Sequence, residues 1–540
     1  MYSYFDSRRS PTYALNGIVS TSQPLAAETG LEILRKGGNA ADAAIATAAA
    51  LAVTEPTGTG IGGDCFALYF DAKTKRVHAI NGSGRSPFNL NLDVIKNAGF
   101  INEMPHIDVH TVTVPGAVAG WEDLLSKHGT LTFKDVLPGA INIADQGFPV
   151  SPIIAYLWSN EVQKTLNASP NSNEMLINGK SPETGQIWQN KKLATILREI
   201  MEGGSKAFYQ GNAGEEIVNI IQSLGGVMTQ KDLDAHTSSF EAPISTNFNG
   251  FTIFECPPNG QGLAALVALS IVNGFNLENS KSGTAERLHL LIESIRLGFD
   301  QARSFVADLD HYQTPIDAIL DSKNINELRS KISPTKRLDL DNSFHQQRGD
   351  DTVYLSVVDG MGNACSFINS NYSGFGTAII PKNCGFTLQN RGAGFSLDPE
   401  HPNVLMPHKR PYHTIIPAMS TDKNGDLFSS FGVMGGYMQP QGHLQVLVSM
   451  LQEGMDPQAA LNQPRFCIKE NPPNGIVYLE EGFSQSAIAG LEQFGHPIKY
   501  LTGIERSSVF GRGQIIVRDP TTSALIGGSD PRADGAAIGY

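Results

Sequence analysis

The 540-residue chain is poor in charge, in cysteine and in long apolar runs, and each shortage excludes a class of protein. Charged residues make up 17% of the chain, the formal net charge is −13, and no lysine- or arginine-rich stripe occurs, so nucleic-acid binding is not expected. The most apolar run, residues 40–53, is too short to cross a bilayer and contains Asp42. Five scattered cysteines form no disulfide framework, and the first ten residues contain no apolar core of a secretory signal. These absences predict a cytoplasmic protein with buried, reduced thiols and no membrane contact.

Several common catalytic motifs are missing or incomplete. Residues 58–63 (GTGIGG) match the dinucleotide pattern literally, but Pro56 precedes them and a strand-like segment follows, so a tight backbone turn is the better interpretation. His106 and His110 have metal-ligand spacing without the glutamate that a metalloprotease helix needs. No G-x-S-x-G sequence of a serine hydrolase occurs. The sequence therefore predicts neither a metal nor a cofactor.

The hydrophobic content of 41% suits a large, well-packed globular enzyme. Periodicity predicts helices and strands in mixed order without regular βαβ alternation, which indicates an α/β (α+β) fold. The predicted helices span residues 25–53 with a break at Gly37 and Gly38, 191–202, 213–224, 284–303 and 440–453. The predicted strands span residues 65–71 and 76–80, which form a hairpin, and 352–358, 364–370, 427–433 and 514–518.

The segment around Thr352 carries the strongest chemical signal. A polar run at residues 342–351 ends in two aspartates and leads directly into a strand rich in β-branched residues, which begins at Thr352. If the chain is cut before Thr352, its hydroxyl becomes a nucleophile and its new α-amine becomes the adjacent base. The plain alternative is a threonine that only begins a strand. We interpret residues 333–351 as a processing loop.

Short motifs in a fixed order make the chain resemble the γ-glutamyltranspeptidase family of N-terminal-nucleophile hydrolases over nearly its whole length. Before Thr352 these are residues 37–44 (GGNAADAA), 60–63 (GIGG), 114–120 (VPGAVAG) and 207–211 (AFYQG). After it they are 356–359 (SVVD), 362–363 (GN), 374–377 (GFGT), 388–390 (LQN), 409–411 (KRP), 435–436 (GG), 460–466 (ALNQPRF) and 529–532 (SDPR).

The resemblance implies a fold and a processing event. The fold is a four-layer αββα sandwich made jointly by both halves of one structural domain. The chain would cut itself between Asp351 and Thr352 into a large chain, residues 1–351, and a small chain, residues 352–540, which stay associated. The sequence leaves the oligomeric state open, a dimer of these heterodimers included.

The resemblance also implies roles for particular residues. Thr352 would be the nucleophile, and Ser370 would supply a second hydroxyl that orients it. Gly435 and Gly436, between a predicted strand and a helix, would direct backbone N–H groups at an oxyanion. Arg85, in a glycine-rich turn, would hold a substrate carboxylate with its guanidinium fork.

Departures from the family pattern concern the substrate. His413 and Thr414 replace two serines that meet the substrate carboxylate, and Tyr372 replaces an asparagine. Gly394 occupies an acidic position that holds an α-ammonium, and Arg391 adds a positive charge close to it, which disfavours a cationic group. This pattern resembles the branch with oxamate amidohydrolase and cephalosporin-acylase-like proteins.

The predicted function is therefore hydrolysis of an amide bond in a small substrate that carries a carboxylate. The substrate would be a γ-glutamyl compound such as glutathione or an oxamate-like amide. Two alternatives remain open: a cephalosporin- or glutaryl-type acylase, and an unprocessed binding protein on the same scaffold.

Overall fold

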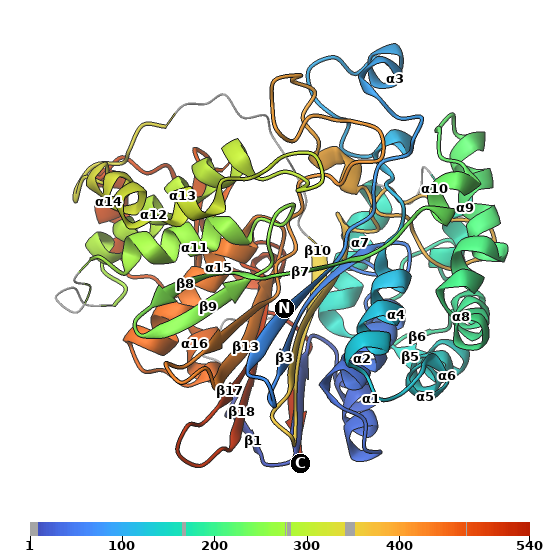
Figure 1. The fold of residues 1–540 in the computed structure, drawn as a ribbon, viewed down its shortest axis with the longest axis horizontal. Coiled ribbons are helices and arrows are strands. Elements are labelled where there is room, and N and C mark those ends of the chain that lie inside the picture. The colour runs from blue at the N-terminus through green and yellow to red at the C-terminus, as the bar shows by residue number, and fades with distance from the viewer. Residues whose placement is uncertain (1–8, 165–168, 276, 278–281, 341–350, 471) are drawn as a thin grey trace.

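The computed structural model describes residues 9–164, 169–275, 277, 282–340, 351–470 and 472–540. Two antiparallel sheets of seven strands each lie face to face between two layers of helices (Figure 1). In the first sheet the order is β1 (Thr12–Ala14), β18 (Leu525–Ser529), β17 (Arg512–Arg518), β13 (Leu427–Met434), β12 (Ala418–Thr421), β9 (Phe251–Glu255) and β8 (Ile244–Phe248). In the second it is β19 (Ala536–Gly539), β2 (Gly17–Thr21), β10 (Asp351–Asp359), β11 (Ala364–Tyr372), β3 (Asp64–Asp71), β4 (Arg76–Gly82) and β7 (Ser239–Glu241).

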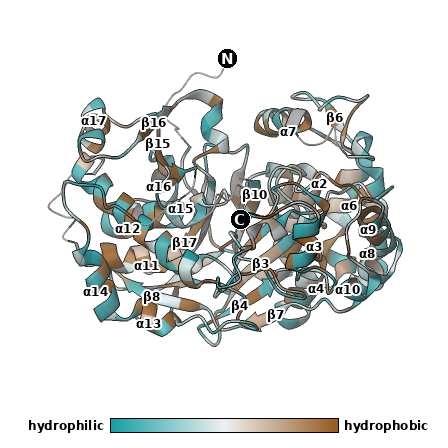
Figure 2. Ribbon diagram, turned by 90° about the horizontal axis from the view of Figure 1, so that it is seen from above, coloured by the Kyte–Doolittle hydropathy of each residue, from teal (hydrophilic) through white to brown (hydrophobic). Residues whose placement is uncertain are grey.

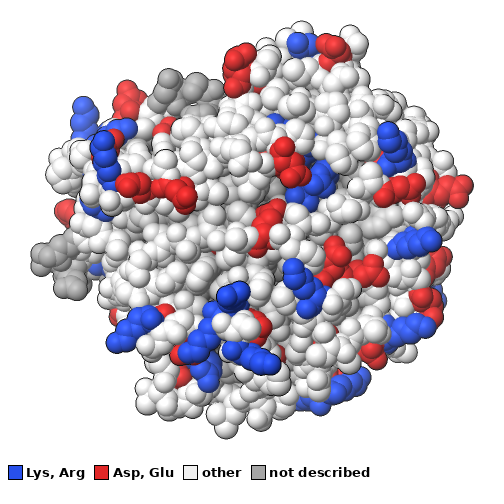
Figure 3. Space-filling view, in the orientation of Figure 1, with Lys and Arg blue, Asp and Glu red and all other residues white. Residues whose placement is uncertain are grey.

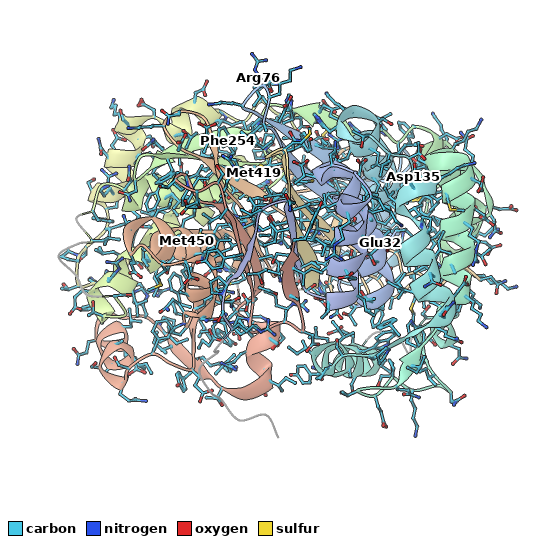
Figure 4. The ribbon with its side chains drawn as sticks, turned by 90° about the horizontal axis from the view of Figure 1, so that it is seen from below. Glu32, Arg76, Asp135, Phe254, Met419 and Met450 are labelled. Atoms are coloured by element: carbon cyan, nitrogen blue, oxygen red, sulfur yellow. The ribbon has the colours of Figure 1, made fainter. Side chains whose placement is uncertain are left out.

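Alternation along the strands explains why the two sheets stack. In β10, Tyr354 and Val358 point into the core between the sheets, where Met419 of β12 is also buried (Figure 4). Val353 and Leu355 belong instead to the core beneath the helices on the outer face. Both faces of the sheet are thus covered, which is why nearly every residue of these central strands is buried.

Helices cover the outer face of each sheet, as the view from above shows (Figure 2). One layer contains α1 (Pro24–Arg35), α2 (Ala40–Thr54), α4 (Ala117–His128), α5 (Phe133–Val136), α6 (Pro138–Gln146), α8 (Lys191–Gln210), α9 (Asn212–Ser223) and α10 (Gln230–Asp234). The other contains α11 (Gly262–Val272), α12 (Ala285–Phe305), α13 (Ile316–Leu320), α14 (Ser322–Ser330), α15 (Met438–Leu447), α16 (Pro457–Asn462) and α17 (Gln485–Gln493). Helices α3 (Leu92–Asn97) and α7 (Pro152–Lys164), the strand pair β5 (Phe148–Pro149) and β6 (Ile187–Trp188), and the sheet of β14 (Phe466–Lys469), β15 (Ile476–Glu480) and β16 (Ile498–Leu501) lie outside the four layers.

The alanine-rich helix α2 is buried along its whole length beneath β10 and β11. Its small side chains let it pack closely against α1 and the sheet. Asn39 caps its first turn, and the Asp42 carboxylate accepts a hydrogen bond from the Asn39 backbone N–H, which fixes where the helix starts.

The layered fold confirms the predicted four-layer sandwich, and strands from both halves of the chain interleave in each sheet. The predicted helices and strands all occur, although α8 continues eight residues past its predicted end at residue 202, with a bend at Gly204. The first part of the expected processing loop is hydrogen-bonded to the rest of the chain. Residues 333–340 are tied to the body of the molecule, because Arg337 N–H donates to Phe494 O and Leu338 N–H donates to Glu293. Residues 341–350 lie outside the described residues.

The surface carries interspersed acidic and basic side chains on the face shown in Figure 3. None of the helices in the described part of the chain is long and apolar enough to cross a membrane. All five cysteines are buried, and none of them forms a disulfide with another described residue.

Candidate active site

Thr352 lies at an irregularity in the strand pair β10–β11. Asp351 pairs with Tyr372 and Val353 pairs with Asn369, so the register shifts across Thr352. Such bulges redirect a side chain and are common beside active sites. The shift places Thr352, which is fully buried, beside Ser370.

The Thr352 hydroxyl faces the peptide bond that precedes it. Its Oγ1 lies 2.9 Å from Ser370 Oγ and donates a hydrogen bond to the carbonyl oxygen of Asp351. Ser370 Oγ lies 3.2 Å from the same carbonyl oxygen. Two hydroxyl groups therefore converge on the carbonyl that self-cleavage would attack.

Ser370 is held in place by two N–H donors. Its Oγ accepts hydrogen bonds from Tyr372 N at 2.9 Å and from Arg391 Nη2 at 3.1 Å. Since these bonds occupy its lone pairs, its single proton is left for Thr352 Oγ1 or the carbonyl oxygen of Asp351.

Arg391 is the charged centre of the site. It opens the 3₁₀ turn Arg391–Gly394 and is fully buried, with Nη1 donating to Thr414 Oγ1 at 2.8 Å. Its guanidinium lies 4.2 Å from the centre of the Tyr372 ring. Burial lowers the pKa of Arg391 to about 10, so the group remains charged at neutral pH.

Asp64, which the sequence did not bring to attention, balances this charge. Its Oδ1 accepts hydrogen bonds from Gly84 N and Gly116 N, each at 3.1 Å, and its Oδ2 lies 3.1 Å from His413 Nε2. Burial raises the pKa of Asp64 to about 6, and the charge of Arg391 opposes that rise. Asp64 therefore offsets part of the positive charge of Arg391. Asp64 directly follows the glycine-rich turn 60–63, which is the signal that could have identified it.

His413 is fully buried, and burial, then the positive charge of Arg391, holds its pKa well below the usual value. A neutral ring can donate from Nε2 to Asp64 and accept at Nδ1 from Ile415 N–H, at 3.4 Å. The structure thus places His413 as a support for Asp64, while Thr414 contacts Arg391 directly.

Gly435 and Gly436 form the turn between β13 and α15. Their φ angles of 129° and 55° favour glycine, and neither amide nitrogen donates a hydrogen bond to another described residue. Gln261 Nε2 donates to both Gly436 O at 2.9 Å and Thr414 O at 2.7 Å, which joins this turn to the Arg391 side of the site. The oxyanion-hole role of these two N–H groups stays a prediction.

Arg85 has other partners in this structure. Its Nη2 lies 3.0 Å from Asp310 Oδ2, and its Nη1 donates to Thr237 O at 3.2 Å. The Asp310 side chain is 63% exposed, whereas that of Arg85 is 11% exposed. Asp310 can therefore move aside for another carboxylate, but the role of Arg85 stays a prediction.

One cluster among the described residues consists of side chains that could bind a metal ion: His289, Glu293 and His496. The separation of 2.8 Å between His289 Nδ1 and His496 Nε2 is that of a hydrogen bond, and His289 Nε2 lies 2.7 Å from Ser333 O. Arg296 Nη1 pairs with Glu293 Oε1 at 2.6 Å, the oxygen that would face an ion. The geometry favours a hydrogen-bonded set over a metal site.

The histidine pair His106 and His110 has separate partners as well. His106 Nε2 lies 3.0 Å from Ser373 Oγ, and His110 Nδ1 lies 2.7 Å from Asp108 Oδ1. These contacts agree with hydrogen-bonded loop histidines.

Comparison with known proteins gives consistent matches over the whole chain. The family description "Gamma-glutamyltranspeptidase" matches residues 26–540. The chain is 36% identical over 521 residues to the glutathione hydrolase-like YwrD proenzyme of Bacillus subtilis (strain 168), covering 95% of this chain and 97% of that protein. It is 30% identical over 540 residues to the oxamate amidohydrolase proenzyme of Klebsiella pneumoniae subsp. pneumoniae, covering 98% of this chain and 100% of that protein.

Solved structures agree with these matches. A cephalosporin acylase from Bacillus halodurans, solved as a crystal structure, is 40% identical in sequence to this chain. The two structures superpose with a TM-score of 0.91, and the match covers 100% of this chain and 98% of that one.

Proposed function

The chain belongs to the γ-glutamyltranspeptidase family, and from this premise we propose that it is a self-processing threonine amidohydrolase acting on a small, carboxylate-bearing amide. One observation carries the proposal: the Thr352 hydroxyl contacts both Ser370 and the carbonyl oxygen of the preceding Asp351. This contact suits an intramolecular attack, and it gives a reason for the bulge at Thr352 that a plain strand start does not.

Self-cleavage would begin when Thr352 Oγ bonds to the carbonyl carbon of Asp351. The bond from that carbon to Thr352 N then breaks, and the hydroxyl proton ends on the nitrogen. Water hydrolyses the resulting ester, which gives a carboxyl-terminal Asp351 and an amino-terminal Thr352. The chains 1–351 and 352–540 would stay together because their strands interleave in both sheets.

The mature enzyme would use the new α-amine as its base. The reference pKa of an α-amine, about 7.7–8.0, lets the group accept and return a proton near neutral pH. Thr352 Oγ would attack the substrate amide, with Gly435 and Gly436 stabilising the oxyanion. Arg391, Tyr372 and Thr414 would line the acyl pocket, and water would release the acyl group without a cofactor.

The substrate class follows from the buried charge of Arg391. The guanidinium favours a substrate group that is anionic or a carbonyl, and the similarity to an oxamate amidohydrolase supports a small acidic amide. A cephalosporin- or glutaryl-type acylase is the second candidate, supported by the likeness to a cephalosporin acylase. Cytoplasmic location and a dimer of heterodimers remain predictions.

We expect kcat/KM for oxamate and for the deaminated glutaryl analogue of glutathione to exceed that for glutathione. The reason is that Gly394 offers no carboxylate to the α-ammonium of a γ-glutamyl group, and Arg391 repels it. Asp64 offsets part of this repulsion, so we expect a difference of about tenfold rather than exclusion. A clear preference for glutathione would show that the α-ammonium has another anionic partner.

Replacing Arg85 with alanine should lower kcat/KM tens- to thousands-fold without stopping self-cleavage. Loss of one partner from a buried, hydrogen-bonded charge pair typically costs about 2–5 kcal/mol. The matched control is Asp310→Asn, which should keep activity, because only Arg85 would face the substrate. Near-normal activity of Arg85→Ala would make its ion pair with Asp310 a surface contact only.

A further inference from the structure

Three buried charged groups form a row of ion pairs that ends at the peptide bond before Thr352. Arg512 Nη1 lies 2.7 Å from Glu55 Oε1, and Arg512 Nη2 lies 2.6 Å from Asp351 Oδ1. The groups come from the end of α2, the start of β17 and the start of β10. Glu55 is fully buried, while Arg512 and Asp351 are 2% and 7% exposed.

Each group in this row is held in place by its neighbours. Ser22 Oγ donates to the second oxygen of Glu55 at 2.5 Å, which holds the carboxylate from its far side. Burial disfavours the charged form of Arg512, but the charges of Glu55 and Asp351 outweigh it and raise the pKa of Arg512, so the guanidinium stays protonated. Burial raises the pKa of Glu55 to about 7 against the opposing charge of Arg512, so the carboxylate is fully charged only above neutral pH. A buried ion pair is weak evidence for stability, because desolvation offsets its attraction. The position of these three groups therefore needs an explanation other than stability.

That explanation lies in what Asp351 contacts. Its Oδ1 accepts the N–H of Thr352 at 3.1 Å, and Thr352 N is the atom that leaves the carbonyl carbon during self-cleavage. Before the bond breaks, this nitrogen takes up the hydroxyl proton and carries positive charge, which it loses when the bonding electrons return to it. A carboxylate fixed beside it stabilises that charge, and a fixed orientation aligns the carbonyl with the Thr352 hydroxyl.

Neighbouring atoms restrict the orientation of the Asp351 side chain. A Cβ on Gly58 would lie 2.9 Å from Asp351 Oδ1 and 3.2 Å from Thr352 N, so the glycine permits the close approach. A cavity of about 350 Å³ has Asp351 and Arg512 among its lining residues, so solvent comes close to this carboxylate from that side.

We propose that Glu55 and Arg512 are positioning residues for self-cleavage: Glu55 orients Arg512, and Arg512 holds the Asp351 carboxylate against the leaving nitrogen of Thr352. The proposal rests on the self-processing function proposed above. Neither residue supplies or removes a proton. The bond formed is Thr352 Oγ to the Asp351 carbonyl carbon, the bond broken is that carbon to Thr352 N, and water completes the hydrolysis.

The test follows the rate at which freshly synthesised full-length chain separates into two chains, by intact mass and gel densitometry. Glu55→Gln keeps the size of the side chain and removes its charge, and it should slow cleavage at least tenfold. Glu55→Asp restores a carboxylate and should cleave faster than Glu55→Gln. Once cleaved, Glu55→Gln should keep kcat/KM per amino-terminal Thr352 within about threefold of wild type.

The matched control is Glu480→Gln, because Glu480 is also a buried carboxylate paired with a buried arginine, Arg532. It should lower the melting temperature about as much as Glu55→Gln but cleave at the wild-type rate. If Glu55→Gln is insoluble, Arg512→Lys provides the second test: its single ammonium cannot bridge both carboxylates as the guanidinium does, so cleavage should again slow at least tenfold.

The outcomes separate the two proposals. An intact wild-type chain would refute self-processing itself. A wild-type chain that cleaves, with Glu55→Gln or Arg512→Lys cleaving equally fast, would overturn only the positioning role. Equal slowing by Glu480→Gln would overturn it too, by tracing the effect to general destabilisation.

Discussion

Thr352→Ala should leave the protein as one uncleaved chain of about 58.0 kDa with no amidohydrolase activity. The hydroxyl that contacts the Asp351 carbonyl is the only proposed nucleophile in both self-cleavage and turnover. The measurement is intact mass after prolonged incubation, followed by amino-terminal sequencing of any fragment. This substitution removes the reacting atom itself, so the expected loss is essentially complete.

Thr352→Ser is the control for this experiment, because it keeps a hydroxyl at the same place. It should still cleave, more slowly, since serine lacks the methyl group that restricts rotation about χ1. Cleavage of Thr352→Ala at the same bond would contradict the assignment of the nucleophile. An intact wild-type protein would instead favour the binding-protein alternative, in which the buried threonine only fills the strand.

The sequence could predict Thr352 and its strand because both signals are local. Residues rich in β-branched side chains define β10, and a polar run precedes it, so neither signal requires knowledge of distant segments. The alanine-rich helix α2 was equally accessible, since its composition alone indicates close packing. The strand start itself was displaced by only one residue, to Asp351.

The partners of these residues could not be predicted in the same way. Arg512 lies 161 positions from Asp351 and 457 from Glu55 in the sequence, and only the stacking of two sheets brings them together. Asp64 likewise reaches His413 across the fold. For Arg391 the charge and the neighbourhood could be predicted. Its contact with Ser370 could not, and that contact changes the expected effect of replacing Arg391.

Arg391→Met should lower kcat/KM for the preferred acidic amide by about 10²- to 10³-fold. The substitution removes the hydrogen bond from Nη2 to Ser370 and the one from Nη1 to Thr414, together with a buried charge that would face the substrate. Charge-assisted hydrogen bonds of this kind contribute about 2–5 kcal/mol when a partner is left buried. Methionine fills similar volume, so packing changes less than hydrogen bonding does.

Self-cleavage should slow as well in Arg391→Met, because Ser370 then loses one of the two donors that direct its proton toward Thr352 and the Asp351 carbonyl. Arg296→Met is the matched control: Arg296 is equally buried and paired with Glu293, and it should lose stability without losing kcat/KM per cleaved chain. Both rates are measured with melting temperatures for the two variants. If Arg391→Met kept its activity, or if Arg296→Met lost as much, the buried guanidinium beside Ser370 would be a packing feature, and the preference for acidic amides would need another cause.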